Sequence, residues 1–572
     1  MTPSRKKLAN GIWISGLILA TTGASLVFSN ENYLGYFVPK YFVFVLGGCL
    51  ALVGRAASPE DQSRALIPTA LDKPLFVALG ILILSSCFSV DPAKSILGQS
   101  KFFLHGLIPI SLVIGLYFAS AGRLNDSIFD KIEWCCIVTG VVLSVWGFTQ
   151  ITFGSRRIIS GLENAAFLGG CLLPSLFCAF DIAVRETKKK KMVAAGCAVI
   201  IMIAISQTYT RAIWLGAILG GATMLMILKR EVIARLGFKK LLGGCLVLLA
   251  GTIIFTKIST PGRTISDSVA LRTEMWRVSW RAANKFPFLG TGPDTYYYAF
   301  KKFRASPSKH TRTWVTAHND FFQTLATLGF PGVICYLWLC GLFLAHCIRE
   351  SRSPWARPRI ALSGAVVSSL FIAAKFNPLP LPALAWLSIF AAYSFTEPSR
   401  RKLIPWRKYA IWVPAMVSLG FTAIAWRLLQ ADRALYRGEQ LAMSEDFRKA
   451  GSEFELAARY SPGESLYAIR AASNILELAN RESLPDKRAE MFDRAKAEIR
   501  KILDKKKNDS DVWHMLSAIQ FRNALNAKDV SELRRAHASI EKALALDPLG
   551  LALNDDRNKI ASLLGRIKHQ RP

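Results

Sequence analysis

Long apolar segments joined by short connections constrain the fold of this chain more than any other feature. A helix needs about 20 apolar residues to cross the hydrocarbon core of a bilayer. Segments of this kind recur along the whole first part of the 572-residue sequence. The predicted spans are 11–29, 37–54, 74–89, 102–119, 134–153, 164–184, 192–209, 211–228, 241–257, 325–347, 359–375, 379–395 and 409–427. We therefore predict an all-α, polytopic membrane protein with 12 or 13 transmembrane helices, in which 359–375 and 379–395 can alternatively form one re-entrant pair.

Charge divides the chain into two predicted domains. Residues 429–572 hold 48 charged residues among 144, whereas residues 1–428 hold 64 among 428. The pattern predicts a transmembrane domain at 1–428 and a separate helical domain at 429–572. It excludes a single soluble globule, a disordered protein and an outer-membrane barrel, whose strands alternate in polarity. The net charge of +32 lies mostly between apolar segments, which favours membrane topology over nucleic-acid binding as its cause.

The distribution of Lys and Arg predicts the orientation of the spans. Alternate connections together carry 27 basic residues, beginning with Arg5, Lys6 and Lys7. Because basic connections stay in the cytoplasm, the N-terminus is predicted to be cytoplasmic. Thirteen spans then place the C-terminal domain outside the cytoplasm, which in a bacterium means the periplasmic or extracytoplasmic side of the inner membrane.

One outer connection, at about 257–320, departs from the charge rule. Residues 257–318 hold eleven Lys and Arg against three acids, a net charge of +8. A long loop can cross a membrane regardless of its charge. Binding of an anionic ligand is one explanation for the charge. The alternative is an amphipathic helix at about 268–285 that lies on anionic headgroups.

Two residues at predicted helix ends on the outer side stand out for their chemistry. His318 precedes the apolar run that begins at 321, and Asn319 or Asp320 can cap that helix. The helix dipole there favours a neutral imidazole, which can act as a base. Arg211 stands between two apolar segments, where an ionisable group is costly unless it snorkels or has a function. Purely structural roles, capping or packing for His318 and snorkelling for Arg211, are the alternatives.

The C-terminal domain shows short amphipathic helices that each end at a helix breaker. Apolar residues on one face precede Ser461-Pro462, Asn508-Asp509 and Asp547-Pro548. The pattern resembles tetratricopeptide repeats, although the breakers are not spaced at multiples of 34 residues. A domain of this kind can hold a protein partner or an acceptor. An unspecific helical bundle is the alternative.

Several motifs together resemble the O-antigen ligase and polymerase family of bacterial membrane glycosyltransferases, over about residues 75–395. The matching motifs are Ser160-Gly161-Leu162-Glu163-Asn164, Gln207-Thr208-Tyr209-Thr210-Arg211, Leu271-Arg272 with Trp276, Pro287-Phe288-Leu289-Gly290-Thr291-Gly292-Pro293, and His318-Asn319-Asp320 followed by Leu325, Leu328-Gly329 and Gly332. The chain departs from the family at Asn164-Ala165-Ala166, where an Asn-Pro-Asn-like run is common. At 210–211, Thr-Arg replaces the more frequent Ser-Arg.

The resemblance implies transfer of a glycan from undecaprenyl diphosphate to an acceptor hydroxyl, without a metal or another cofactor. The acceptor would be lipid A-core, another glycan or a protein, and no nucleic acid is involved. In this interpretation Arg211 and Arg272 bind the leaving diphosphate, because guanidinium groups pair with phosphate oxygens. His318 is the general base. The candidates for substrate binding are Arg156, Arg157, Asn164, Trp276, Arg281 and Asn319.

Three related activities fit this chemistry: a glycan ligase, a polysaccharide polymerase and a protein O-oligosaccharyltransferase. A transporter or scaffold that recruits an anionic polymer through the basic loop is an alternative from another class. Few charged residues lie in mid-span and no inverted repeat is evident, which disfavours transport.

Overall fold

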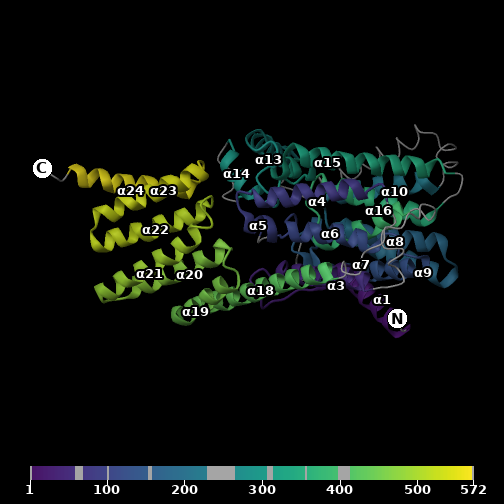
Figure 1. Ribbon diagram of the computed structural model, residues 1–572, viewed down its shortest axis with the longest axis horizontal. Coiled ribbons are helices and arrows are strands. Elements are labelled where there is room, and N and C mark those ends of the chain that lie inside the picture. Colours follow the sequence, from purple (N-terminus) through teal and green to yellow (C-terminus); the bar gives the residue numbers. More distant parts are fainter. Residues whose placement is uncertain are drawn as a thin grey trace.

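The computed structural model describes residues 3–57, 69–99, 102–152, 157–228, 265–305, 313–353, 357–396 and 412–569. The described residues form helices and connections and contain no strand, which confirms the predicted all-α class. Figure 1 shows two parts, a bundle of near-parallel helices and a smaller helical tail. The N-terminus lies at the end of the bundle far from the tail, and the C-terminus lies at the distal tip of the tail.

The bundle contains most of the predicted spans. Eight of its described helices are long and apolar enough to cross a membrane, and three more are apolar but shorter. Twelve of the thirteen predicted spans coincide with described helices, and the segment 241–257 lies outside the described residues. The helices are α1 (Pro3–Ile18), a π-helical turn (Leu19–Gly23), α2 (Ala24–Leu26), α3 (Val38–Ala56), α4 (Asp72–Cys87), α6 (Leu107–Ser120), α7 (Asp126–Thr152), α8 (Ala165–Arg185), α9 (Lys188–Gln207), α10 (Arg211–Leu228), α15 (Asp320–Ser351), α16 (Pro358–Ala374), α17 (Leu381–Phe395) and α18 (Trp412–Met443). The protein is a multi-pass membrane protein.

Small residues allow close packing inside the bundle. A Cβ added at Gly16 would lie 2.2 Å from the backbone of Ala51, and one at Gly47 would lie 2.3 Å from that of Ala20. Such contacts let α1 and α3 approach each other directly, as is common for small residues between membrane helices. Helix α8 has the largest buried share of the eight helices that are long enough to cross a membrane, so it forms the centre of the bundle.

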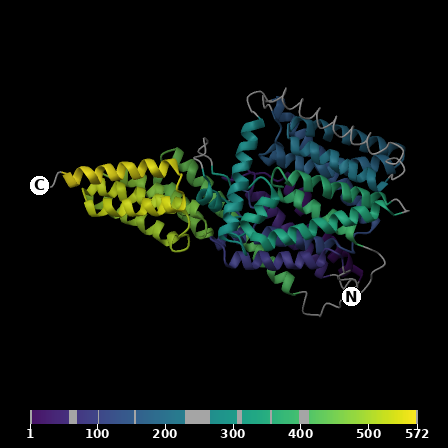
Figure 2. The ribbon, with the colours of Figure 1, turned by 90° about the horizontal axis from the view of Figure 1, so that it is seen from above.

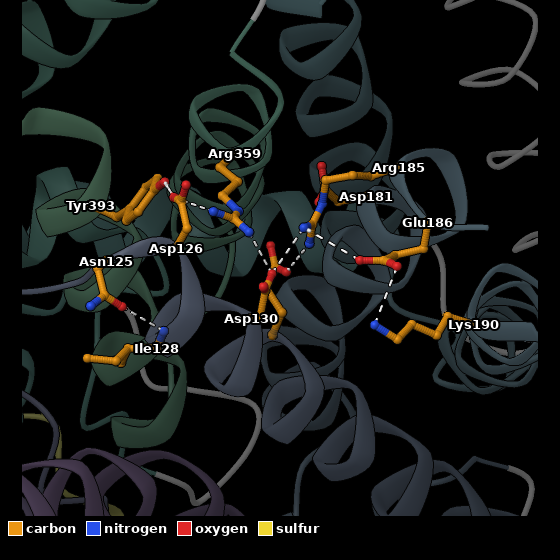
Figure 3. A network of polar contacts seen from close by, with 11 residues as sticks. Asn125, Asp126, Ile128, Asp130, Asp181, Arg185, Glu186, Lys190, Arg359 and Tyr393 are labelled. Carbon is orange, nitrogen blue, oxygen red and sulfur yellow. Dashed lines mark hydrogen bonds and ion pairs between the residues drawn. The ribbon is translucent and has the colours of Figure 1, made fainter.

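The end of the bundle opposite the tail is fixed by buried charges (Figure 3). Arg185, at the end of α8, contacts Asp181 at 3.1 Å, Asp130 at 3.0 Å and Glu133 at 2.7 Å. Arg359, at the start of α16, also contacts Asp130, at 2.7 Å. Glu133 and Asp181 are nearly inaccessible to solvent. The ion pairs therefore join α7, α8 and α16, and they compensate carboxylates that would be costly to bury alone.

At the tail-side end, meaning the end of the bundle that faces the tail, two further segments cover the helices. These are α13 (Ile265–Lys285) and α14 (Tyr296–Phe303), with the short helix α5 (Pro92–Leu97) beside them. The segment at about 268–285, for which an amphipathic helix was the alternative interpretation, is helical and forms most of α13. The apolar core that joins α13, α14 and the start of α15 contains Met275, Val278, Ala282, Tyr296, Ala299, Phe300, Ala317 and Ala326.

The turn 287–293 attaches α13 to α15. The backbone N–H groups of Thr291 and Gly292 donate to the carbonyls of Ala326 and Thr327, both at 3.0 Å. α15 is interrupted at this point, because Gly329 has a φ of +69°. Gly290 lies against the backbone of Thr327, and Gly292 lies against the side chains of Ser89 and Ser95, so close packing explains the motif without a nucleotide.

The tail is continuous with the bundle. The single helix α18 crosses the predicted domain boundary at 428/429 and ends fifteen residues beyond it, at Met443. The following helices pack in sequence as antiparallel neighbours. They are α19 (Phe447–Tyr460), α20 (Ser465–Arg481), α21 (Pro485–Leu503), α22 (Ser510–Ala527), α23 (Val530–Leu546) and α24 (Leu551–His569). Figures 1 and 2 both show the tail extending away from the bundle, so a helical tail is present where the breaker pattern predicted one.

Candidate active site

His318 lies in the connection that leads into α15, at the tail-side end of the bundle. Its φ is +50°, an unusual conformation for a residue with a Cβ, and such outliers are common at functional sites. The next residue, Asn319, caps α15 by accepting from the N–H groups of Phe321 and Phe322 at 2.9 and 3.3 Å. The predicted cap is therefore present, and it fixes His318 at the helix start.

The imidazole of His318 is held by the connection between α16 and α17. The side chain of Asn377 and the backbone of Phe376 lie near enough to favour the protonated imidazole. The ring of Trp314 packs edge-on against it, with the centroids 5.3 Å apart. Burial and, second, the charge of Arg272 lower the pKa of His318 to about 4, although the contacts with Asn377 and Phe376 act in the other direction. The imidazole is therefore neutral at pH 7.

Arg272 lies near this histidine, and Arg211 lies near Arg272 on another helix. Arg272 of α13 donates to the carbonyl of Phe376 at 3.4 Å, and its guanidinium lies 6.0 Å from the ring of Phe376. Burial and the nearby charge of Arg211 lower the pKa of Arg272. Within the described part of the chain, no carboxylate pairs with either guanidinium. Two cations thus lie near each other with no carboxylate partner among the described residues, an arrangement that suits a diphosphate.

Arg211 is the first residue of α10, and the preceding connection is tightly held. Arg157 donates to the carbonyl of Thr208 through Nε and Nη2, at 2.9 and 2.7 Å, and to Oγ1 of Thr210 at 3.0 Å. Tyr209, between these residues, has a φ of +47°. Arg157 therefore fixes the backbone that presents Arg211, whereas Arg156 lies outside the described residues.

The remaining predicted binding residues also have partners within the fold. Asn164 caps α8 by accepting from the N–H of Ala166 at 2.9 Å. Arg281 donates to Glu274 at 3.3 Å and to the carbonyl of Phe303 at 2.8 Å. Trp276 stacks on Phe322, with the ring centroids 5.0 Å apart and the planes 11° from parallel. One face of that indole is therefore occupied by the protein.

The connection at 375–377 contributes residues that were not among the sequence candidates. Lys375 contacts Asp320 at 2.6 Å, and Asp320 accepts from the hydroxyl of Tyr336 at 2.8 Å. The side chain of Asn319 donates to the carbonyl of Lys375 at 3.0 Å. The break at Asn377-Pro378 between two short apolar segments was the only sequence signal for this connection, and it gave no hint of contact with His318.

Part of the basic loop has a structural use that the sequence did not reveal. Lys301 and Arg304 of α14 form ion pairs with Asp511 and Asp547 of the tail, at 2.7 and 2.6 Å. Anion binding was the predicted reason for the net charge of this loop. These two residues instead pair with anions of the same chain, whereas Arg272 lies near enough to His318 for its charge to lower the pKa of the imidazole.

The geometry defines a class, a multi-pass membrane protein with a neutral histidine and an arginine pair grouped at one end of its helical bundle. Residues 196–337 match the model of a protein family described as O-antigen ligase. The match includes Arg211, Arg272, Trp276, Arg281, His318 and Asn319, and it confirms the resemblance to that family. No curated protein and no solved structure gives a significant match to the chain. The family supports a role in glycosyl transfer for surface polysaccharides.

Proposed function

We propose that the protein transfers a glycan from a polyprenyl-diphosphate carrier to an acceptor hydroxyl at the outer face of the bacterial inner membrane. The observation that carries this proposal is the grouping of neutral His318 with Arg272 and Arg211. A glycosyl transfer from a lipid diphosphate needs a base for the acceptor and positive charge for the leaving group, and this site offers both.

In the proposed reaction the acceptor oxygen attacks the anomeric carbon of the lipid-linked glycan. The bond from that carbon to the diphosphate oxygen breaks, and its electron pair leaves with the diphosphate. The proton of the acceptor hydroxyl passes to the imidazole of His318. Arg211 and Arg272 stabilise the charge that develops on the leaving diphosphate, and Arg157 keeps Arg211 in place. The acceptor is lipid A-core, another glycan or a protein.

Substitution of the three central residues tests the proposal. His318→Ala, Arg211→Ala and Arg272→Ala should each lower transfer by about 100-fold or more, the scale of lost acid–base or charge stabilisation. Arg211→Lys should recover little activity, because an ammonium lacks the planar fork of the guanidinium. Arg277→Ala is the matched control, since Arg277 lies exposed on the same helix as Arg272.

The assay uses purified protein, a polyprenyl-diphosphate-linked glycan and, separately, lipid A-core, glycan and peptide acceptors, with products resolved on gels. The acceptor that gains mass distinguishes ligase, polymerase and protein glycosyltransferase. Full activity of His318→Ala would contradict the role of His318 as the general base. Full activity of both Arg211→Ala and Arg272→Ala would contradict their role in binding the diphosphate. Binding or transport of polymer by a protein that transfers no glycan would favour the transporter or scaffold.

A further inference from the structure

The tail is attached to the bundle by polar contacts in addition to the continuous helix α18. Asp432 in α18 accepts from the backbone N–H of Leu34 at 3.1 Å and from the side chain of Asn32 at 3.0 Å. The turn before α22 reaches the connection that leads into α5, where Asn508 donates to the carbonyl of Val90 at 3.0 Å. The tail is therefore held against the tail-side end of the bundle at several separate places.

One of these contacts is a buried ion pair. Lys506 of the tail pairs with Asp91, and the two side chains are only 2% and 3% exposed. Asp91 also accepts from the hydroxyl of Tyr298 in α14, at 2.6 Å. Removing one partner from such a group leaves an uncompensated buried charge, which is strongly unfavourable. The tail, α5 and α14 thus meet in one buried polar group.

α14 carries two further ion pairs to the tail. Lys301 contacts Asp511 at 2.7 Å and the hydroxyl of Ser510 at 2.9 Å. Arg304 contacts Asp547 at 2.6 Å, and both side chains are 8% exposed. A buried, hydrogen-bonded pair such as Arg304–Asp547 fixes geometry more firmly than an exposed pair does.

The other side of α14 is fixed to α13. The hydroxyl of Tyr296 donates to the carbonyl of Met275 at 2.7 Å. Arg281 of α13 donates to the carbonyl of Phe303 at 2.8 Å. The rings of Tyr296 and Phe300 lie in the same apolar core as Met275. α14 therefore lies between the tail and the helix that carries Arg272.

We infer that the tail positions the active site, acting through α14 to hold α13 and Arg272 in register with His318. Arg304 and Asp547 are positioning residues in this inference, because they touch neither His318 nor Arg272. The inference rests on the proposed function and extends it, by giving the tail a role in the rate of transfer in addition to any acceptor binding.

A charge exchange across the α14–tail contact tests the inference. Arg304→Asp and Asp547→Arg each place two like charges together, whereas the double variant restores an opposite pair. Each single variant should lower kcat by about 10- to 100-fold, the scale of a small misplacement in an active site. The KM for the acceptor should not change, and the double variant should regain most of the lost activity. Arg304→Gln is a milder version should a like-charge variant fail to fold.

The matched control is Glu532→Gln, which breaks a pair inside the tail. Lys496 and Glu532 are 3.1 Å apart, and Glu532 is 3% exposed, so the control removes a comparable contact that does not reach α14. Kinetics should remain at the wild-type level in this variant. The inference would be overturned by any of three results. These are wild-type kinetics in both Arg304→Asp and Asp547→Arg, a change in the acceptor KM alone, or no recovery of activity in the double variant.

Hydrogen–deuterium exchange supplies a readout that does not depend on activity. Peptides that cover residues 270–285 should exchange faster in both single variants and return to the wild-type rate in the double variant. Unchanged exchange in α13 would also overturn the inference. A wild-type protein without transfer activity would instead contradict the proposed function, while the exchange experiment would still decide whether the tail controls α13.

Discussion

His318 shows how a few contacts set the chemistry of one residue. Its ring is enclosed by Trp314 and by the connection that carries Asn377, and the guanidinium of Arg272 is close by. Burial disfavours the charged imidazole, and a neighbouring cation disfavours it further. Both effects keep the ring neutral where an ordinary histidine would be partly protonated.

The first prediction concerns pH. Because the pKa of His318 is lowered to about 4, the rate of transfer should stay near its plateau at pH 6 and fall only at lower pH. Arg272→Gln removes a charge that lowers this pKa, so the acidic limb of its residual activity should move upward toward the ordinary value of 6.5. The measurement is kcat/KM against pH, with Arg277→Gln as the control. An acidic limb at the same pH in Arg272→Gln would contradict the assignment.

The same shift has a consequence for stability. A histidine whose folded-state pKa lies below its unfolded-state value binds its proton more weakly in the folded protein. Below about pH 6.5 the unfolded state takes up a proton that the folded state does not, so protonation of this histidine lowers the free energy of unfolding. The loss grows as the pH falls and is complete at about pH 4. Thermal unfolding of His318→Gln should therefore depend less on pH across this window than that of the wild type.

At the scale of elements, the turn 287–293 depends on backbone approach that only glycine permits. A Cβ at Gly290 would lie 2.2 Å from the backbone of Thr327, and the φ of Gly290 is +62°. Gly329 on the other side of the contact is restricted in the same way, because a Cβ there would lie 2.4 Å from the carbonyl oxygen of Pro287. The close contact between the turn that follows α13 and helix α15 thus requires both glycines.

We predict that Gly290→Ala destabilises the protein by about 1–3 kcal/mol or more, through overpacking and backbone strain together. Transfer should fall as well, since α13 carries Arg272. The control is Gly196→Ala in α9, where nothing lies within 4 Å of the added Cβ. Thermal unfolding in detergent measures both variants, and equal melting temperatures would contradict the proposed role of the turn.

Arg185 supports a second prediction at this scale. Arg185→Ala would leave Glu133 and Asp181 buried without their cation, and breaking a buried pair in this way costs about 3–5 kcal/mol. Lys190→Ala, which removes the exposed partner of Glu186, should cost about 0–1 kcal/mol. Thermal unfolding compares the two, and similar losses would show that the buried network contributes little.

At the scale of the whole molecule, the N-terminus and the tail lie at opposite ends of the bundle (Figure 1). This arrangement agrees with an odd number of spans, and the distribution of Lys and Arg predicts that the tail lies outside the cytoplasm. A periplasmic phosphatase fused after Leu441 should therefore be active, and the same reporter fused after Arg352 should be inactive. If the phosphatase is inactive after Leu441 and a reporter that works only in the cytoplasm is active at the same position, the predicted topology is wrong.

The sequence by itself predicted the helical class, twelve apolar segments that coincide with described helices, the helix at α13 and the cap at Asn319, and it proposed the three central residues of the candidate site. These features follow from local chemistry, since apolar length, capping side chains and short motifs act over a few neighbouring residues. The tertiary structure decided which distant residues meet. It placed Asn377 beside His318 and Lys506 beside Asp91, 415 positions away. It also paired part of the basic loop with the acids of the tail. A charge in a sequence shows that a partner is needed, but only the folded chain brings that partner within the few ångströms over which ion pairs and hydrogen bonds act.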